Sequence, residues 1–139
     1  LHIRGVVFKK YEKALQTLQA VECSQIYGDS YRMAPGAVLG IGNNVSVVFE
    51  DMNFPEDGVD AVRICGRSAL EKNTIHIRFH GTDGESVQLA EFAGSEDWSE
   101  QDFDLEPLKG AGTISFVFLP GCSFDFKSFR FYKKEDGNQ

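Results

Sequence analysis

A chain of 139 residues is long enough for one domain with a substantial core, and its 42% hydrophobic and 25% charged content is typical of a globular protein. The net charge of −7, with no run of more than two lysines or arginines, argues against a surface for nucleic acid. No apolar run approaches the roughly 20 residues that span a bilayer, so no membrane partner is expected.

Three widely spaced cysteines, Cys23, Cys65 and Cys122, form neither a CxxC metal pattern nor a disulfide framework. We interpret them as small buried hydrophobes, in a reducing environment or in a protein indifferent to redox state. The chain opens with Leu1 and has no signal peptide, so we expect a domain of a longer protein.

The N-terminal part is expected to be a connector. Apolar residues recur at helical spacing up to Leu18, which predicts a short helix within residues 1–19 or a connector that docks on a neighbouring domain. Strands are expected at residues 21–23 and 31–33. The motif GIGNN at residues 40–44 lacks the following lysine and helix of a phosphate loop, so it indicates an ordinary loop.

The middle of the chain alternates between apolar and polar residues, as strands with one buried face do. Val45, Val47 and Phe49 form one such strand. In the next clear strand His76, Arg78 and His80 point outward from an apolar face. Glycines 81 and 84 predict a hairpin turn, after which a returning strand is expected to face inward. Its inward residues would be Val87, Leu89 and Phe92.

The closing stretch, residues 113–131, carries six phenylalanines and should build much of the core. Alternation changes parity after Ser128, which predicts a β-bulge or a corner. Eight to ten short strands with turn signals every 8–12 residues predict an all-β fold, an antiparallel sandwich or barrel. We place the domain at residues 20–132 and a polar tail at residues 133–139.

Two groups of residues are candidates for binding. His76 and His80 would stand about 13 Å apart along a strand, too far to share one metal ion. Together with Arg78 they form either a solvated outer face or a polar floor for a ligand on a concave sheet. Trp98, the only tryptophan, is either a core or lid residue or a platform for a sugar ring.

Asn43, Asn44 and Asp125 could supply the polar contacts beside Trp98, or they could be turn residues that bond their own backbone. No GxSxG, HExxH or other catalytic signature occurs in the chain. We therefore expect no enzyme activity from this fragment.

Three segments together resemble family 6 carbohydrate-binding modules. They are VECS at residues 21–24, GIGNNVSVVF at residues 40–49 and DFKSFRF at residues 125–131. The whole chain also resembles modules at the C-terminal end of bacterial glycoside hydrolase family 2 enzymes, chiefly β-galactosidases. The resemblance implies an antiparallel β-sandwich jelly roll, galactose-binding-domain-like, with a sugar site at the loop apex or on the concave face.

Under this resemblance Trp98 is one wall of the apical site and Asp125 replaces a ligand asparagine. The other aromatic wall has no counterpart, because residues 37–39 are aliphatic. The family's structural calcium is also implied, but only Glu22 matches an acid, while Ser24 and Lys127 stand where acids are expected. We expect that calcium site to be degenerate.

The resulting hypothesis is a non-catalytic accessory module that binds galactosides or related glycans weakly. Its partners would be a carbohydrate and the catalytic domains of the parent enzyme. The missing parent sequence would decide between the bacterial cytoplasm and secretion. The alternative is a structural jelly roll without a sugar site, which supports the parent's fold or oligomer. An independent enzyme is the third possibility.

Overall fold

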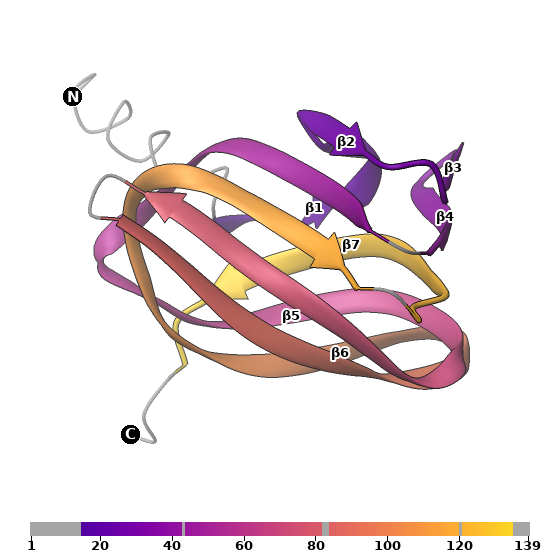
Figure 1. The fold of residues 1–139 in the computed structure, drawn as a ribbon. Helices are drawn as coiled ribbons and strands as arrows, with labels where there is room; N and C mark the ends of the chain where they lie inside the picture. The colour runs from indigo at the N-terminus through magenta and orange to yellow at the C-terminus, as the bar shows by residue number, and fades with distance from the viewer. Residues whose placement is uncertain (1–14, 43, 82–83, 120, 135–139) are drawn as a thin grey trace.

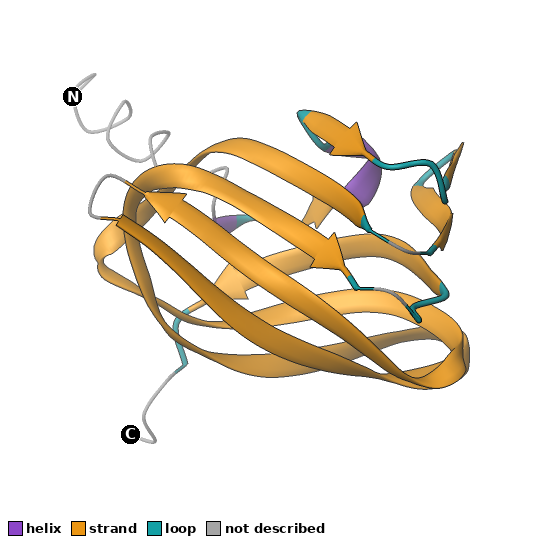
Figure 2. Ribbon diagram, in the orientation of Figure 1, coloured by secondary structure: helices purple, strands orange, loops and turns teal. Residues whose placement is uncertain are grey.

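The computed structural model describes residues 15–42, 44–81, 84–119 and 121–134, apart from the side chains of residues 56 and 57. Almost all of it is strand, and the described helical structure is a short 3₁₀ turn and the fragment at Leu15 (Figure 2). No described helix is long and apolar enough to cross a membrane. The elements in chain order are β1 Leu18–Gln19, η1 Ala20–Glu22, β2 Gln25–Tyr27, β3 Arg32–Ala34, β4 Ala37–Ile41, β5 Val45–Gly81, β6 Gly84–Phe118 and β7 Phe124–Tyr132.

All strand pairs are antiparallel, and the two long strands β5 and β6 bend so that each contributes to both layers of a sandwich (Figure 1). In the front layer of Figure 1, the end of β6 lies between the beginning and the end of β5, and β2 pairs with the beginning of β5. In the back layer, β7 lies between β4 and the middle of β5. The predicted all-β jelly roll is confirmed.

The core between the layers consists largely of phenylalanine rings. Phe116 packs at a steep angle against Phe49 and Phe126, with ring centroids 6.0 and 5.2 Å apart. Such edge-to-face contacts add to the energy of burial. The predicted inward residues of the strands around Val47, Ile77 and Phe116 are confirmed as buried. The phenylalanines with the most complete burial are Phe49, Phe54, Phe92, Phe116, Phe118, Phe124, Phe126, Phe129 and Phe131.

The predicted parity change in β7 is a β-bulge. Cys65 pairs with Ser128 but the next residue, Gly66, pairs with Phe126, so Lys127 is the extra residue of β7. Both Phe126 and Phe129 are therefore buried although they are three residues apart. Gly66 is needed opposite the bulge, because a Cβ there would lie 2.3 Å from the Phe124 ring.

The strand expected at residues 21–23 is wrong, and the expected returning strand is present but buries Phe92, as predicted, and not Val87 and Leu89. Residues 20–22 form the 3₁₀ turn η1, and the first paired strand after it begins at Gln25. The returning strand after the hairpin has the opposite parity: Val87 and Leu89 are 48% and 61% exposed, while Ala90 is buried. Pairing sets this register, because Ile75 stands opposite Ala90.

The ends of the chain are described in part. Residues 1–14 of the expected helix or connector and residues 135–139 of the expected tail lie outside the described residues. Leu18, which fitted the helical spacing, instead lies in β1 and pairs with Phe129. The division at residues 19 and 133 stays a prediction. Of the cysteines, all free, only Cys122 is buried, while Cys23 and Cys65 are half-buried.

Candidate functional site

A hollow of about 350 Å³ opens among the turns at the end of the sandwich where β7 begins. Its walls come from three parts of the chain: the middle of β5, the middle of β6 and the approach to β7. Strand pairing brings these parts together, since Arg67 stands directly opposite Asp125. The hollow is lined by Arg67, Ser68, Ala69, Ser95, Glu96, Ser123 and Asp125.

Asp125, predicted as a polar site residue, is held by two donors. Its Oδ1 accepts a hydrogen bond from the backbone N–H of Gly40 at 2.9 Å, and its Oδ2 accepts one from Arg67 Nε at 2.7 Å. The Asp125 side chain is 25% exposed and that of Arg67 37%. The carboxylate is thus fixed in orientation at the wall of the hollow.

Trp98, a further predicted site residue, is connected to Asp125 through Arg67. The guanidinium carbon of Arg67 lies 4.3 Å from the centroid of the Trp98 ring, and the ammonium of Lys127 lies 5.4 Å from it. Both distances are within the range of cation–π attraction. Trp98 is half-buried, and these two cations lie near its ring.

The floor of the hollow is a buried polar network. The Asn73 amide is fully buried and joins the turn at residues 68–73 to the backbone before β7. Its Oδ1 accepts from Ser68 Oγ and from the Ser123 N–H, at 3.0 and 3.2 Å. Because one bond closes the turn at residues 68–73 and the other joins it to the backbone before β7, this network holds the two segments in fixed positions.

Of the two predicted asparagines, the structure describes only Asn44, which is not among the residues that line the hollow. Asn43 lies outside the described residues. Asn44 is exposed, has a positive φ of 57° and donates its backbone N–H to the carbonyl of Phe118. That geometry fits the turn-residue interpretation of Asn44. The loop does reach the site through Gly40, whose N–H binds Asp125.

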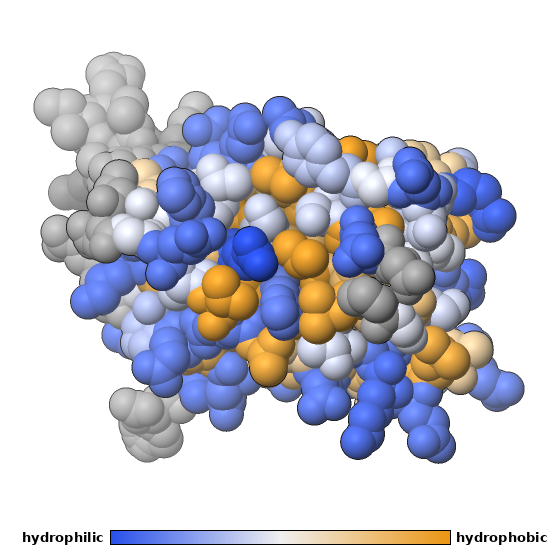
Figure 3. Space-filling model, in the orientation of Figure 1, coloured by the Kyte–Doolittle hydropathy of each residue, from blue (hydrophilic) through white to orange (hydrophobic). Residues whose placement is uncertain are grey.

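His76 and Arg78 lie on the outer face of the front layer, away from Trp98. Their strand neighbours on one side are Leu89 and Val87, which the sequence had placed inward. Figure 3 shows apolar side chains gathered over the middle of this face. This outer face is therefore half apolar and half polar, a second surface that is separate from the hollow.

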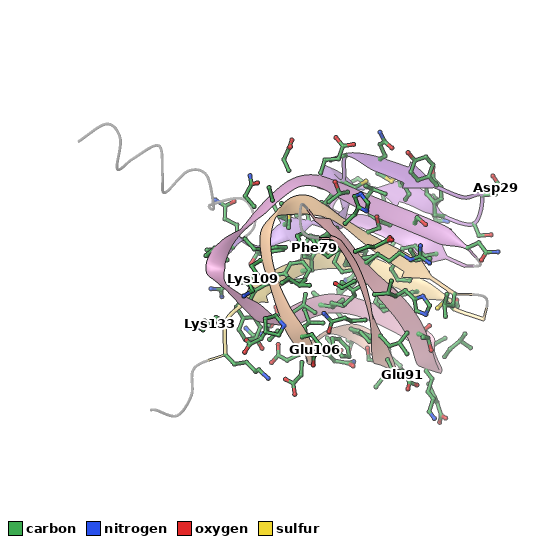
Figure 4. The ribbon with its side chains drawn as sticks, turned by 60° about the vertical axis from the view of Figure 1, so that its left-hand side comes forward. Asp29, Phe79, Glu91, Glu106, Lys109 and Lys133 are labelled. Carbon is green, nitrogen blue, oxygen red and sulfur yellow. The ribbon has the colours of Figure 1, made fainter. Side chains whose placement is uncertain are left out.

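The opposite end of the molecule has its own hollow, of about 300 Å³. Lys109, which lines it, lies toward the left in Figure 4, and Asp29 lies at the far right. Asp29 adjoins Ser30, whose carbonyl accepts a hydrogen bond from the backbone N–H of Gly42, in the loop at residues 40–44. The two hollows are therefore at opposite ends of the sandwich.

Two of the residues expected at the degenerate calcium site, Ser24 and Lys127, make other contacts in the structure. Ser24 Oγ accepts a hydrogen bond from the backbone N–H of Glu50 at 3.0 Å. Lys127, a cation where an oxygen ligand would be needed, points its ammonium toward Trp98. Within the described ranges, no three His, Cys, Asp or Glu side chains form a group that could hold a metal.

Comparison with solved structures identifies the architecture. A family 6 carbohydrate-binding module from Clostridium stercorarium, in complex with cellobiose, superposes with a TM-score of 0.75 at 20% identity, over 87% of this chain and 95% of that one. A family 6 module from Clostridium cellulolyticum in complex with xylose gives 0.73 at 20% identity, over 86% and 98%. The chain has the fold of family 6 carbohydrate-binding modules.

The same fold occurs inside a larger enzyme. A glycoside hydrolase family 43 arabinoxylan arabinofuranohydrolase from Bacillus subtilis matches with a TM-score of 0.70 at 18% identity, over 87% of this chain but only 28% of that one. No protein-family model matches the sequence, and no curated protein does. At these identities the likeness establishes the fold alone.

Proposed function

We propose that this chain is a non-catalytic carbohydrate-binding module that holds galactosides or related glycans weakly in the hollow of Arg67 and Asp125. The observation that carries the proposal is a hollow of about 350 Å³ bordered by Asp125, in a fold shared with modules solved in complex with cellobiose and xylose. The volume is at the lower end for small-molecule sites, which suits one or two sugar units.

The lining offers hydrogen bonds more than stacking. Asp125 and Glu96 present carboxylates, and Ser95 and Ser123 add further polar groups. The Arg67 guanidinium already lies against the Trp98 ring, so a sugar gains little from that ring while the arginine stays. Weak binding follows, with dissociation constants in the range of about 1 mM.

The parent protein belongs to the same proposal. We infer a bacterial glycoside hydrolase of family 2, a β-galactosidase, in which this module would keep substrate near the catalytic domains. The sequence resemblance supports this parent. The match to part of a larger glycoside hydrolase supports an accessory position, though that enzyme belongs to another family.

Titration calorimetry with galactose, lactose and plant galactans tests the binding, and Trp98 fluorescence reports on the hollow. We expect saturable binding that is lost in Asp125→Ala and kept in Asp29→Ala, an exposed acid of a different loop. Binding by neither the wild type nor any variant, with unmoved fluorescence, would contradict the proposal.

The outer face of the front layer favours a second function, that of a structural domain. Exposed Val87 and Leu89 lie next to Arg78 and His76, as on a surface that docks against another domain. The same face is the alternative place for a glycan, with His76 and Arg78 as its polar groups. Charge substitutions at Val87 and Leu89 in the parent enzyme would impair assembly if the face docks, and polysaccharide binding if it holds glycan.

A further inference from the structure

Arg67 is held in the hollow by two contacts, and no local sequence pattern identifies it. Its Nε donates to Asp125 at 2.7 Å, and its guanidinium carbon lies 4.3 Å from the Trp98 ring centroid. Two contacts on different sides of the planar group determine its position. Trp98 is not among the residues that line the hollow, in keeping with the cover that the guanidinium provides.

This arrangement changes which ligands fit. A neutral sugar gains most of its affinity for an aromatic wall by stacking its C–H face on the ring. Here the guanidinium takes that place, and moving it would break the ion pair with Asp125. A neutral sugar would therefore have to displace a charged group and leave a partly buried carboxylate without its cation.

The outer edge of the guanidinium offers hydrogen-bond donors to a ligand. Only Nε has an acceptor among the described residues, which leaves the two Nη groups without a recorded one. Arg67 lines the hollow and is 37% exposed, so this edge is accessible. Two parallel N–H donors match the two oxygens of a carboxylate.

The charges around the hollow permit such a ligand. Arg67 and Lys127 carry two positive charges beside Trp98, and Asp125 and Glu96 carry two negative charges on the wall. These four charges cancel one another, in a chain whose net charge is −7. An incoming carboxylate meets less repulsion here than the overall charge suggests.

We propose that Arg67 makes the hollow selective for glycans that carry a carboxylate, such as a galacturonide, over the corresponding neutral galactoside. The inference rests on the proposed function, because it names the ligand class of the same site. Beyond that function, the inference assigns to Arg67 the discrimination between acidic and neutral glycans.

The chain supplies a matched control for this arginine. Arg63, on the same outer face of β5, forms an ion pair with Asp102 at 2.7 Å and lies over the Tyr132 ring at 5.6 Å. It therefore repeats the carboxylate–arginine–aromatic arrangement outside the hollow of Arg67 and Asp125. A general effect of removing an exposed arginine charge should appear equally in Arg63→Gln.

The experiment compares methyl galactoside with methyl galacturonide, which differ only at C6, by titration at low ionic strength. We expect the wild type and Arg63→Gln to bind the galacturonide about tenfold more tightly, as one charge-assisted hydrogen bond allows. In Arg67→Gln the preference should fall to about twofold or less, while acrylamide quenching of Trp98 increases. Arg67→Lys, which keeps the charge, should show an intermediate preference.

Equal affinity of the wild type for both ligands would overturn the selectivity while leaving the proposed function intact. An unchanged preference in both Arg67→Gln and Arg67→Lys would also overturn it. Binding of neither ligand to any variant would instead count against glycan binding itself, and the inference would fail with it. Thermal unfolding of each variant shows whether it is folded, and the lysine variant remains informative if the glutamine variant is not.

Discussion

Asn73 is the residue on which the shape of the hollow depends most. Its amide accepts from Ser68 and the Ser123 N–H and donates to the carbonyls of Leu70 and Phe92. Asn73→Ala would leave several of these buried groups without a partner, so we expect the free energy of unfolding to fall by about 2–4 kcal/mol. Urea unfolding of the wild type and of Asn73→Ala measures this difference.

Asn53→Ala is the control for this change. Asn53 lies in the same strand, is half-buried and has no side-chain hydrogen bond recorded among the described residues. Its replacement should cost well under 1 kcal/mol. Equal losses for the two variants would mean that the Asn73 network adds nothing to stability.

The ion pair of Asp102 with Arg63 predicts that the stability of the protein depends on pH. The hydrogen bond from Arg63 holds the pKa of the Asp102 carboxyl below its usual range. The pair therefore stabilises the protein above the unfolded-state pKa, about 3.9, and this contribution is lost as the pH falls through the lower folded-state pKa. Since the two side chains are 43% and 49% exposed, we expect only about 0.2–1 kcal/mol.

Urea unfolding at pH values between about 6 and 2 tests this. Asp102→Asn should be less stable than the wild type near pH 6, and the two should converge in acid. Asp29→Asn, at an exposed loop acid, should follow the wild type throughout. A stability difference for Asp102→Asn that stays constant with pH would contradict the assignment.

At the scale of elements, the bulge in β7 predicts a difference between substitution and deletion of one residue. Lys127 is the extra residue that keeps both Phe126 and Phe129 buried. Its deletion would turn Phe129 and Phe131 to the outer face, so we expect no folded protein. Lys127→Ala keeps the chain length, and its free energy of unfolding should lie within about 1 kcal/mol of the wild-type value. Circular dichroism and urea unfolding distinguish the two, and a stable deletion variant would show that the bulge is dispensable.

The strands show where sequence patterns suffice. Alternation predicted the buried faces around Ile77 and Phe116, and the parity change predicted the bulge, because one face of each strand carries clearly larger apolar residues. It failed after the hairpin, where Val87 and Leu89 alternate as cleanly as Ala90 and Phe92 do. Only the pairing with the preceding strand decides which set faces inward.

At the scale of the whole molecule, the site was predictable only in part. The family resemblance predicted Asp125 and Trp98 as site residues, and the structure places Arg67 in contact with both. Arg67 was missed, since it joins Asp125 from 58 residues away and no local pattern identifies it. For Asn44 the sequence left two alternatives open, because a turn asparagine and a ligand asparagine look alike in a sequence, and its positive φ fits the turn.

The thermal stability of the whole fold is also expected to be independent of calcium. In place of acid ligands, Ser24 is engaged with the backbone of Glu50 and Lys127 brings a positive charge. Calcium that bound the folded state alone would raise the melting temperature with its concentration. We therefore expect the same melting temperature in excess calcium, in excess magnesium and in EDTA, by scanning calorimetry. A shift of several degrees that calcium produces, magnesium does not and EDTA reverses would show that oxygen ligands other than these residues assemble a site.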